Sequence, residues 1–132
     1  MDYVLDTHVL IWALFDSKKL SKKVKNIILN PDNNIYVSII SFWEISLKVN
    51  LGKISFKDVS PEELPEYAEK SGFEILALRP DVVASFHQLP SADHKDPFDR
   101  LIIWQCIQQK ITLLSKDEQF SQYSKHALNA IW

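Results

Sequence analysis

The chain has 132 residues, with 15 Lys and Arg against 17 Asp and Glu, which gives a formal net charge of −2. A composition of 46% hydrophobic and 24% charged residues excludes a disordered or low-complexity protein, and the single cysteine excludes a disulfide framework. This length suits one domain over residues 1–132. The sequence shows neither a membrane-spanning apolar run nor a signal peptide, so we expect a soluble cytoplasmic protein.

The first half of the chain alternates between strand and helix patterns. A β-favouring run at residues 3–5 predicts a buried strand, and helical spacing of apolar residues follows at 7–14. A second amphipathic helix is predicted over 18–28, with most of its lysines off the apolar face. The continuous apolar run at 35–40 predicts a strand that is buried on both faces of a parallel sheet. Ser41 and Glu44 then fit a capping box that opens a helix.

The second half repeats this alternation. A hydroxyl cap followed by proline predicts a helix from Ser60 towards Gly72, and a shorter helix is predicted at 81–87. After a polar loop at 90–95, the pair Asp96-Pro97 opens a strong helix. The strands predicted in this half cover residues 73–78, 112–114 and, as a short fifth strand, 127–131.

Strands that alternate with helices imply crossover connections between parallel strands. We therefore predict an α/β fold, a three-layer α/β/α sandwich around a mostly parallel sheet of four to five strands. In such sheets, ligands bind outside the carboxyl ends of the strands.

Five acidic residues follow the predicted strands or open the helices behind them: Asp6, Glu44, Asp96, Asp99 and Asp117. Each has a structural alternative, because Asp96 and Asp117 suit helix N-caps while Glu44 and Asp99 suit capping boxes. For Asp96 the capping role is the better interpretation. Asp6 is harder to explain in this way, since it directly follows a buried strand, where an unpaired carboxylate would cost several kcal/mol.

Together, these acids indicate a metal site. Two carboxylates about 5 Å apart repel each other by roughly 3 kcal/mol at an effective dielectric constant near 20, so a cluster must take up protons or hold a cation. An all-oxygen site suits Mg²⁺ or Mn²⁺. The four histidines lack ligand spacing and suit surface or supporting positions. Because there is no phosphate-binding Walker A loop, hydrolysis of a phosphodiester is the leading reaction.

Four segments of the chain, LDTHVLIW, SFWEISLK, HKDPFDRLIIWQC and LLSKDEQFSQY, together resemble PIN-domain proteins, above all VapC-type toxins of bacterial toxin–antitoxin pairs. The resemblance spans nearly the whole chain in the expected order, and DPFDRLI is its most specific part. It implies a Mg²⁺- or Mn²⁺-dependent endoribonuclease that forms a homodimer. It also implies a small antitoxin protein that blocks the site, and RNA as the substrate.

The resemblance also implies roles for individual residues. Asp6, Glu44, Asp99 and Asp117 match the four acids of the family in that order, so they would be the catalytic and metal-binding residues. Asp117 is the least certain match, because the fourth acid varies most in position. Asp96 is an additional acid of the DPFD variant and a further metal ligand. Thr7 matches a hydroxyl that supports the metal site, and its structural alternative is to cap the helix that starts there. Trp104 stands where the family often has a small residue, which affects packing more than catalysis.

Basic and aromatic residues near these segments carry weaker expectations. The candidates for RNA contacts are Lys48, Lys53, Lys95, Arg100 and Lys116. The aromatic side chains of Trp12, Phe42 and Trp43 suit the core, although some of them could form a groove for an antitoxin helix. Cys106 lies on an apolar helical face and suits a small buried position.

Two other classes stay open. A phosphoryl-transfer or phosphate-binding module of the haloacid-dehalogenase or receiver type also has acids at strand ends, but here no second Asp follows Asp6 at the spacing of either class. A PIN-like domain that binds without catalysing is the other alternative, although none of the expected acids is missing.

Overall fold

The computed structural model describes residues 1–90 and 93–132, so two residues of the polar loop predicted at 90–95 lie outside the described part. A five-stranded sheet runs through the molecule in the order β3-β2-β1-β4-β5, and all four strand pairs are parallel. The strands are β1 (Asp2–Leu5), β2 (Asn34–Ser38), β3 (Glu74–Leu76), β4 (Thr112–Leu114) and β5 (Ala130–Ile131). The predicted parallel α/β sheet is confirmed.

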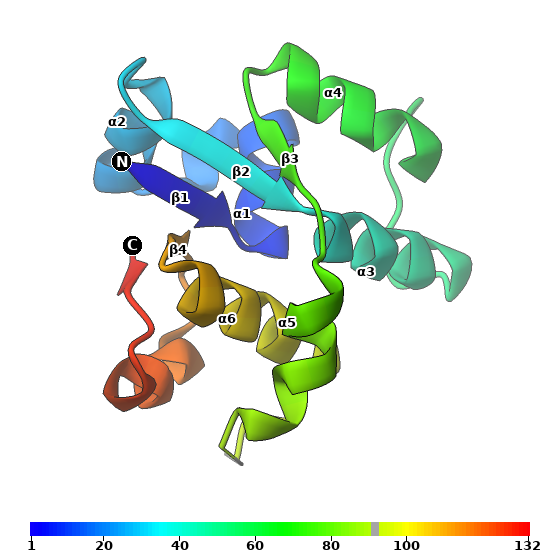
Figure 1. The fold of residues 1–132 in the computed structure, drawn as a ribbon. Coiled ribbons are helices and arrows are strands. Elements are labelled where there is room, and N and C mark those ends of the chain that lie inside the picture. The colour runs from blue at the N-terminus through cyan, green and yellow to red at the C-terminus, as the bar shows by residue number, and fades with distance from the viewer. Residues whose placement is uncertain (91–92) are drawn as a thin grey trace.

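Helices cover both faces of this sheet (Figure 1). One layer contains α1 (Thr7–Phe15), α2 (Lys22–Leu29), α3 (Ile39–Asn50) and α4 (Leu64–Lys70). The other contains α5 (Pro80–Ser85), α6 (Pro97–Gln109) and the 3-10 helix Glu118–His126. Alternation along β1 explains the two layers, since Leu5 packs into the first core and Val4 into the second. This arrangement is the predicted three-layer sandwich.

The boundary between β2 and α3 differs from the prediction. The strand ends at Ser38, and the apolar pair Ile39-Ile40 begins the helix instead of completing the strand. The buried Ser38 causes this early turn, because its hydroxyl accepts a hydrogen bond from the backbone N–H of Ile40 and caps the helix. Ser41 therefore lies inside α3, and the capping box predicted for it is wrong.

Other predicted helix boundaries are confirmed. Ser60 and Glu63 form the reciprocal capping box that opens the short 3-10 helix before α4. Gly72 follows α4 with a φ of +88°, a conformation that glycine adopts without strain. Asp96 caps α6 by accepting hydrogen bonds from the backbone N–H groups of Phe98 and Asp99.

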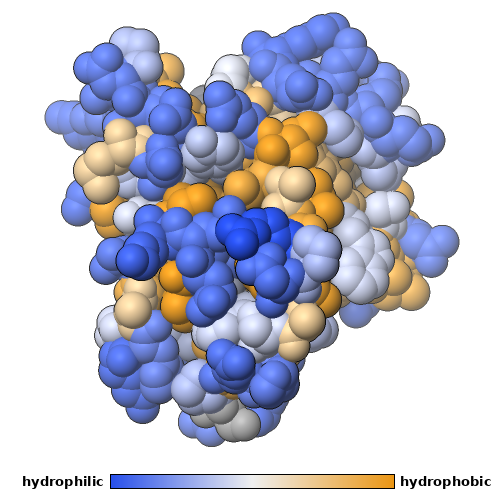
Figure 2. Space-filling view, in the orientation of Figure 1, coloured by the Kyte–Doolittle hydropathy of each residue, from blue (hydrophilic) through white to orange (hydrophobic). Residues whose placement is uncertain are grey.

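The surface is mixed in polarity. In Figure 2, hydrophilic residues cover most of the outer helices, and hydrophobic residues gather in the upper middle of this face, over β2 and β3. β3 is an edge strand of three residues and exposes 36% of Ile75. Among the described residues, no helix is both long and apolar enough to cross a membrane.

Candidate functional site

Asp6 marks the end of β1 and links it to β4. Leu5 and Leu114 are register partners in these parallel strands, so the residues that follow them, Asp6 and Ser115, lie side by side. One Asp6 oxygen accepts a hydrogen bond from the N–H of Val9 at 2.8 Å, and the other accepts one from the Ser115 hydroxyl. Burial raises the pKa of the Asp6 carboxyl, which is only 5% exposed, while these hydrogen bonds oppose that rise.

Thr7 connects α1 to α3. Its hydroxyl donates a hydrogen bond of 2.7 Å to Oε1 of Glu44 and lies 3.0 Å from the hydroxyl of Ser41. All three side chains are buried. Glu44 therefore makes long-range contacts rather than the local capping contact that was its structural alternative, and that alternative is wrong. The register of α3, set by Ser38, turns Glu44 inwards to this position.

Lys48 supplies a fixed positive charge to the acids. Its ammonium donates a hydrogen bond to Oε2 of Glu44 one helical turn away. Partial burial acts to lower the pKa of Lys48, but the Glu44 hydrogen bond and the charges of Glu44, Asp96 and Asp99 raise it above its usual value. Lys48 therefore stays protonated beside the cluster.

Asp99 belongs to a group of three carboxylates. One oxygen each of Glu44, Asp96 and Asp99 lie within 4.8 Å of one another. Burial raises the pKa of Asp99 to about 6, and the neighbouring charges of Asp96 and Glu44 contribute to that rise. Asp96 also caps α6, so its structural alternative holds, and the same residue belongs to the acidic group.

His94 is a hydrogen-bond partner of Asp99. Its Nε2 lies 3.1 Å from Oδ2 of Asp99, and its Nδ1 lies 3.2 Å from the hydroxyl of Tyr123. Arg100 donates to that same hydroxyl at 2.9 Å. Because a guanidinium only donates, the Tyr123 hydrogen is free to point at Nδ1, which leaves Nε2–H to donate to Asp99. The chain Arg100–Tyr123–His94–Asp99 thus orients one carboxylate.

Asp117 also lies near Asp99. His94, Asp99 and Asp117 form a second group whose ligand atoms lie within 4.8 Å of one another. Asp117 caps the 3-10 helix through the N–H of Gln119, as its structural alternative predicted. Its own backbone N–H donates to the Ser115 hydroxyl, which in turn donates to Asp6. Ser115 therefore ties Asp117 to Asp6.

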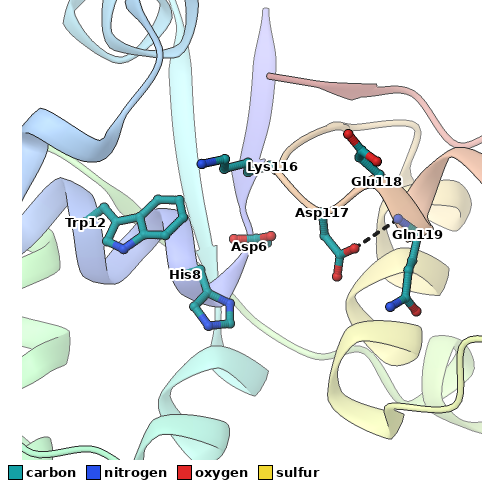
Figure 3. Close-up of a pocket in the computed structure, with 7 residues that line it drawn as sticks. All are labelled: Asp6, His8, Trp12, Lys116, Asp117, Glu118 and Gln119. Carbon is teal, nitrogen blue, oxygen red and sulfur yellow. Dashed lines mark hydrogen bonds between the residues drawn. The ribbon is translucent and has the colours of Figure 1, made fainter.

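Asp6 belongs to neither group of three among the described residues. It lines instead, together with Asp117, a cleft with a cavity volume of about 620 Å³ (Figure 3). His8 and Trp12 form one wall of this cleft, with Lys116 between them and the second wall, formed by Asp117 and Gln119. The structure thus brings all five predicted acids to the carboxyl edge of the sheet, in two overlapping groups and an adjoining cleft.

The candidate RNA contacts have different surroundings. Lys116 lines the cleft and Lys48 pairs with Glu44. Arg100 is half-buried and donates to Tyr123 and to the carbonyl groups of Leu89 and Pro90, and its contact with RNA stays a prediction. Lys53 and Lys95 are exposed, Lys53 in the turn after α3.

The three aromatic residues also differ. Phe42 packs against the first core, as its default interpretation expected. Trp43 is 62% exposed and lines an apolar groove of about 200 Å³ between α3, α5 and α6. In this groove its ring meets that of Phe98 edge-on, with 4.9 Å between the ring centres. Trp12 is half-buried at the cleft. Cys106 is buried, as expected, and burial strongly raises the pKa of its thiol.

Sequence reasoning missed Tyr123 and Ser115, and it gave His94 only the surface or supporting position that it gave to all four histidines. A signal for His94 existed, since it stands five residues before Asp99 in the HKDPFD segment. The sequence held no signal for Tyr123 or Ser115. Tyr123 contacts His94 across 29 residues of the chain, and Ser115 contacts Asp6 across 109.

The donor set fits a hard divalent cation. The two groups of three share Asp99, and four of their five residues offer carboxylate oxygens, which suit Mg²⁺ and Mn²⁺ rather than Zn²⁺. The raised pKa of Asp99 shows that its charge is poorly compensated by the protein alone. His94 is already directed at Asp99, so we assign it to orienting that carboxylate.

Comparisons with known proteins agree with this architecture. The sequence profile described as PIN domain matches residues 3–126. The chain is similar to ribonuclease VapC22 of Mycobacterium tuberculosis, with 26% identity over 129 residues, covering 98% of this chain and 97% of the relative.

Solved structures share the fold. VapBC2 from Rickettsia felis, crystallised with a DNA fragment from its promoter, has a TM-score of 0.72 at 21% identity and covers 99% of this chain and 98% of its own. VapBC-1 from nontypeable Haemophilus influenzae has a TM-score of 0.65 at 16% identity and covers 99% and 97%. The profile match over most of its length, joined to this fold, confirms the resemblance to PIN-domain proteins of the VapC type, and the chain belongs to the PIN-domain family.

Proposed function

We propose that this protein is a Mg²⁺- or Mn²⁺-dependent endoribonuclease and the toxin of a toxin–antitoxin pair. The observation that carries the proposal is the crowding of Asp99 with Glu44 and Asp96 at the carboxyl edge of a PIN-type sheet. The likeness to a ribonuclease, VapC22, over almost the whole chain supports RNA as the substrate.

The proposed roles of the acids follow from their surroundings. Asp99 would hold the cation directly, with Glu44, Asp96 and Asp117 completing its ligands or orienting water. Asp6, which lines the adjoining cleft with Asp117, would be the second direct ligand. When bound, such a cation supplies charge neutralisation for phosphate oxygens and activation of a water molecule.

The chain's own contribution is orientation. Thr7 fixes the Glu44 carboxylate and His94 fixes that of Asp99, so neither acid loses rotamer freedom when the substrate arrives. Lys48 limits the repulsion within the cluster. Lys116, exposed at the cleft, is available to a phosphate of the RNA backbone.

A small antitoxin protein is the proposed partner, and a homodimer in the cytoplasm is the proposed state. Solved relatives of the same fold are VapBC proteins, one of them described as a member of the VapBC family of toxin–antitoxin systems. The apolar groove beside Trp43 and Phe98 adjoins Asp96 and Asp99 in sequence, so an amphipathic antitoxin helix there would lie close to the acids.

The test is cleavage of purified cellular RNA with Mg²⁺, with Mn²⁺ and with a chelator. Asp6→Asn and Asp99→Asn, prepared in parallel, control for contaminating ribonuclease. We expect metal-dependent cleavage by the wild type and its loss in both variants. Cleavage that survives both substitutions would contradict the assignment of the site. If no sample cleaves RNA, calorimetric titration with Mn²⁺ separates a metal-binding protein that does not catalyse from one without a metal site.

A further inference from the structure

One wall of the cleft beside Asp6 is aromatic, and the proposed roles of the acids give this wall no function. Trp12 lies one helical turn after His8 on α1, and their rings are 6.0 Å apart at 45°. The indole of Trp12 also meets Trp132 edge-on at 5.8 Å. Trp132 thus supports the indole from the protein side, while Trp12 keeps part of its own surface at the cleft.

A positive charge lies against the same ring. The Lys116 ammonium is 5.9 Å from the centre of the Trp12 ring, and the lysine side chain is exposed. Such a cation–π contact at an exposed site is weak, so an incoming planar group can displace it. Lys116 follows Ser115, the residue that holds Asp6, so the displaced ammonium would stay close to the acids.

We infer that Trp12, His8 and Lys116 form a subsite for one unpaired nucleobase of the RNA, next to the bond that is cut. This inference rests on the proposed ribonuclease function. A ligand that presents a phosphate to a cation beside Asp6 and Asp117 and a flat aromatic group to Trp12 in the same cleft would be a nucleotide. A cavity of about 620 Å³ has room for it.

The geometry also favours a single strand. A base can stack on an aromatic side chain only when it has left its neighbours in a duplex. Figure 3 shows the side chain of Gln119 on the opposite wall of the cleft, where its amide can form hydrogen bonds with the edge of a base. The base that enters this subsite therefore comes from an unpaired position of the RNA.

The experiment uses a single-stranded RNA oligonucleotide whose cut position has been mapped with the wild-type protein. It is compared with the same oligonucleotide lacking the base of each nucleotide that flanks the cut. Each is cleaved by the wild type and by Trp12→Leu, and kcat/KM is measured for every pair. Anisotropy of the labelled oligonucleotides in Ca²⁺, with gels to check that they stay intact, measures binding separately.

For the wild type, we expect removal of one flanking base to lower kcat/KM and affinity by about tenfold or more, in line with base–aromatic stacking. Trp12→Leu should show the same loss on the intact RNA and no further loss on the abasic RNA. Trp12→Phe, which keeps an aromatic face and preserves the packing better, should stay within a few-fold of the wild type. The matched control is Tyr67→Leu, which removes a 41% exposed aromatic side chain on α4, away from the cleft.

Other outcomes overturn the inference. One such outcome is that Trp12→Leu and Tyr67→Leu cleave and bind RNA alike. The other is that the losses from Trp12→Leu and from the missing base multiply. In either case the base binds elsewhere, and the nucleobase subsite is contradicted while the proposed ribonuclease function is not. If the wild type neither binds nor cleaves any RNA, the proposed function fails together with the subsite.

Discussion

The two ends of the acidic site treat their central carboxylates differently. At one end, both oxygens of Asp6 accept hydrogen bonds from the chain, from Val9 and from Ser115. At the other end, Asp99 has one such partner, His94, and faces two further carboxylates, Asp96 and Glu44. Burial is the main cause of the raised pKa at both residues, and like charges add to it: Asp117 at Asp6, and Asp96 and Glu44 at Asp99.

This difference indicates that Asp6 stabilises the fold and that Asp99 destabilises it. Asp6 caps α1 and joins β1 to β4, so its loss removes structural contacts. Asp99 has a hydrogen bond with His94 but lies beside two like charges, which is typical of groups placed for function at the expense of stability. Substitutions at the two ends should therefore affect activity alike and stability in opposite directions.

The largest expected effect is on catalysis. Asp99→Asn should lower the rate of RNA cleavage more than about 100-fold, beyond the loss usual for a residue that only supports a metal ligand. The same variant should melt at the wild-type temperature or a few degrees above it in chelator, because a repelling charge has been removed. Cleavage assays and thermal melts of one preparation measure both.

Asp6→Ala is the contrasting variant. It should also abolish cleavage, but its melting temperature should fall, since losing a helix cap costs about 1 kcal/mol and the Ser115 hydroxyl loses its acceptor. Asp6→Asn keeps an acceptor oxygen for the cap and should melt closer to the wild type. A rise in melting temperature for Asp6→Ala would erase the distinction between the two ends.

Metal binding should act through the Asp99 end. Adding Mn²⁺ or Mg²⁺ at neutral pH should raise the melting temperature of the wild type, with about 2.7 kcal/mol of stabilisation at one hundred times the dissociation constant. The shift should be absent or small for Asp99→Asn. An equal shift in both proteins would assign the ion to another part of the site.

The pH dependence of stability sharpens the comparison. Because the pKa of Asp99 is raised to about 6 in the folded protein, the folded state holds this proton more tightly than the unfolded state does. The metal-free protein should therefore lose stability from this group as the pH rises from about 4 to about 7. The measurement is urea unfolding of wild type and Asp99→Asn across this range in chelator. The variant's advantage should grow with pH and then level off, whereas a constant difference would contradict the cause assigned to it.

The smallest effect concerns the residues that orient Asp99. Tyr123→Phe removes the hydroxyl that joins Arg100 to His94, and it should lower cleavage by about tenfold. Stability should fall by about 1–2 kcal/mol, because Arg100 loses a buried acceptor. A matched control is Tyr36→Phe, which changes a half-buried tyrosine of β2 outside this chain of hydrogen bonds and should cleave normally.

Most of the fold could be predicted because local signals agreed with one another. Buried apolar runs marked the strands, and the capping residues Ser60 and Asp96 marked helix starts that the structure confirms. The boundary after β2 could not be placed, since an apolar run is compatible with either a strand or a buried helix, and only the turn at Ser38 decides between them.

The rule that parallel strands end at a common edge predicts that the acids lie together. Their hydrogen-bond partners could not be predicted. Each carboxylate also satisfied a local pattern, and the structure shows that Asp96 and Asp117 do serve as caps while standing in the acidic groups. The contacts of Thr7 with Glu44 and of His94 with Tyr123 depend on how the layers pack, which no local spacing encodes.

The ion pair between Lys48 and Glu44 bears on whether the protein needs a divalent ion in order to fold. Small zinc-dependent domains stay unfolded until their ion arrives, because nothing else holds their ligands together. Here a side chain of the same helix already balances part of the negative charge, and hydrophobic cores on both faces of the sheet hold the strands that carry the acids. These contacts need no divalent ion, so we expect the chain to fold even where such ions are scarce.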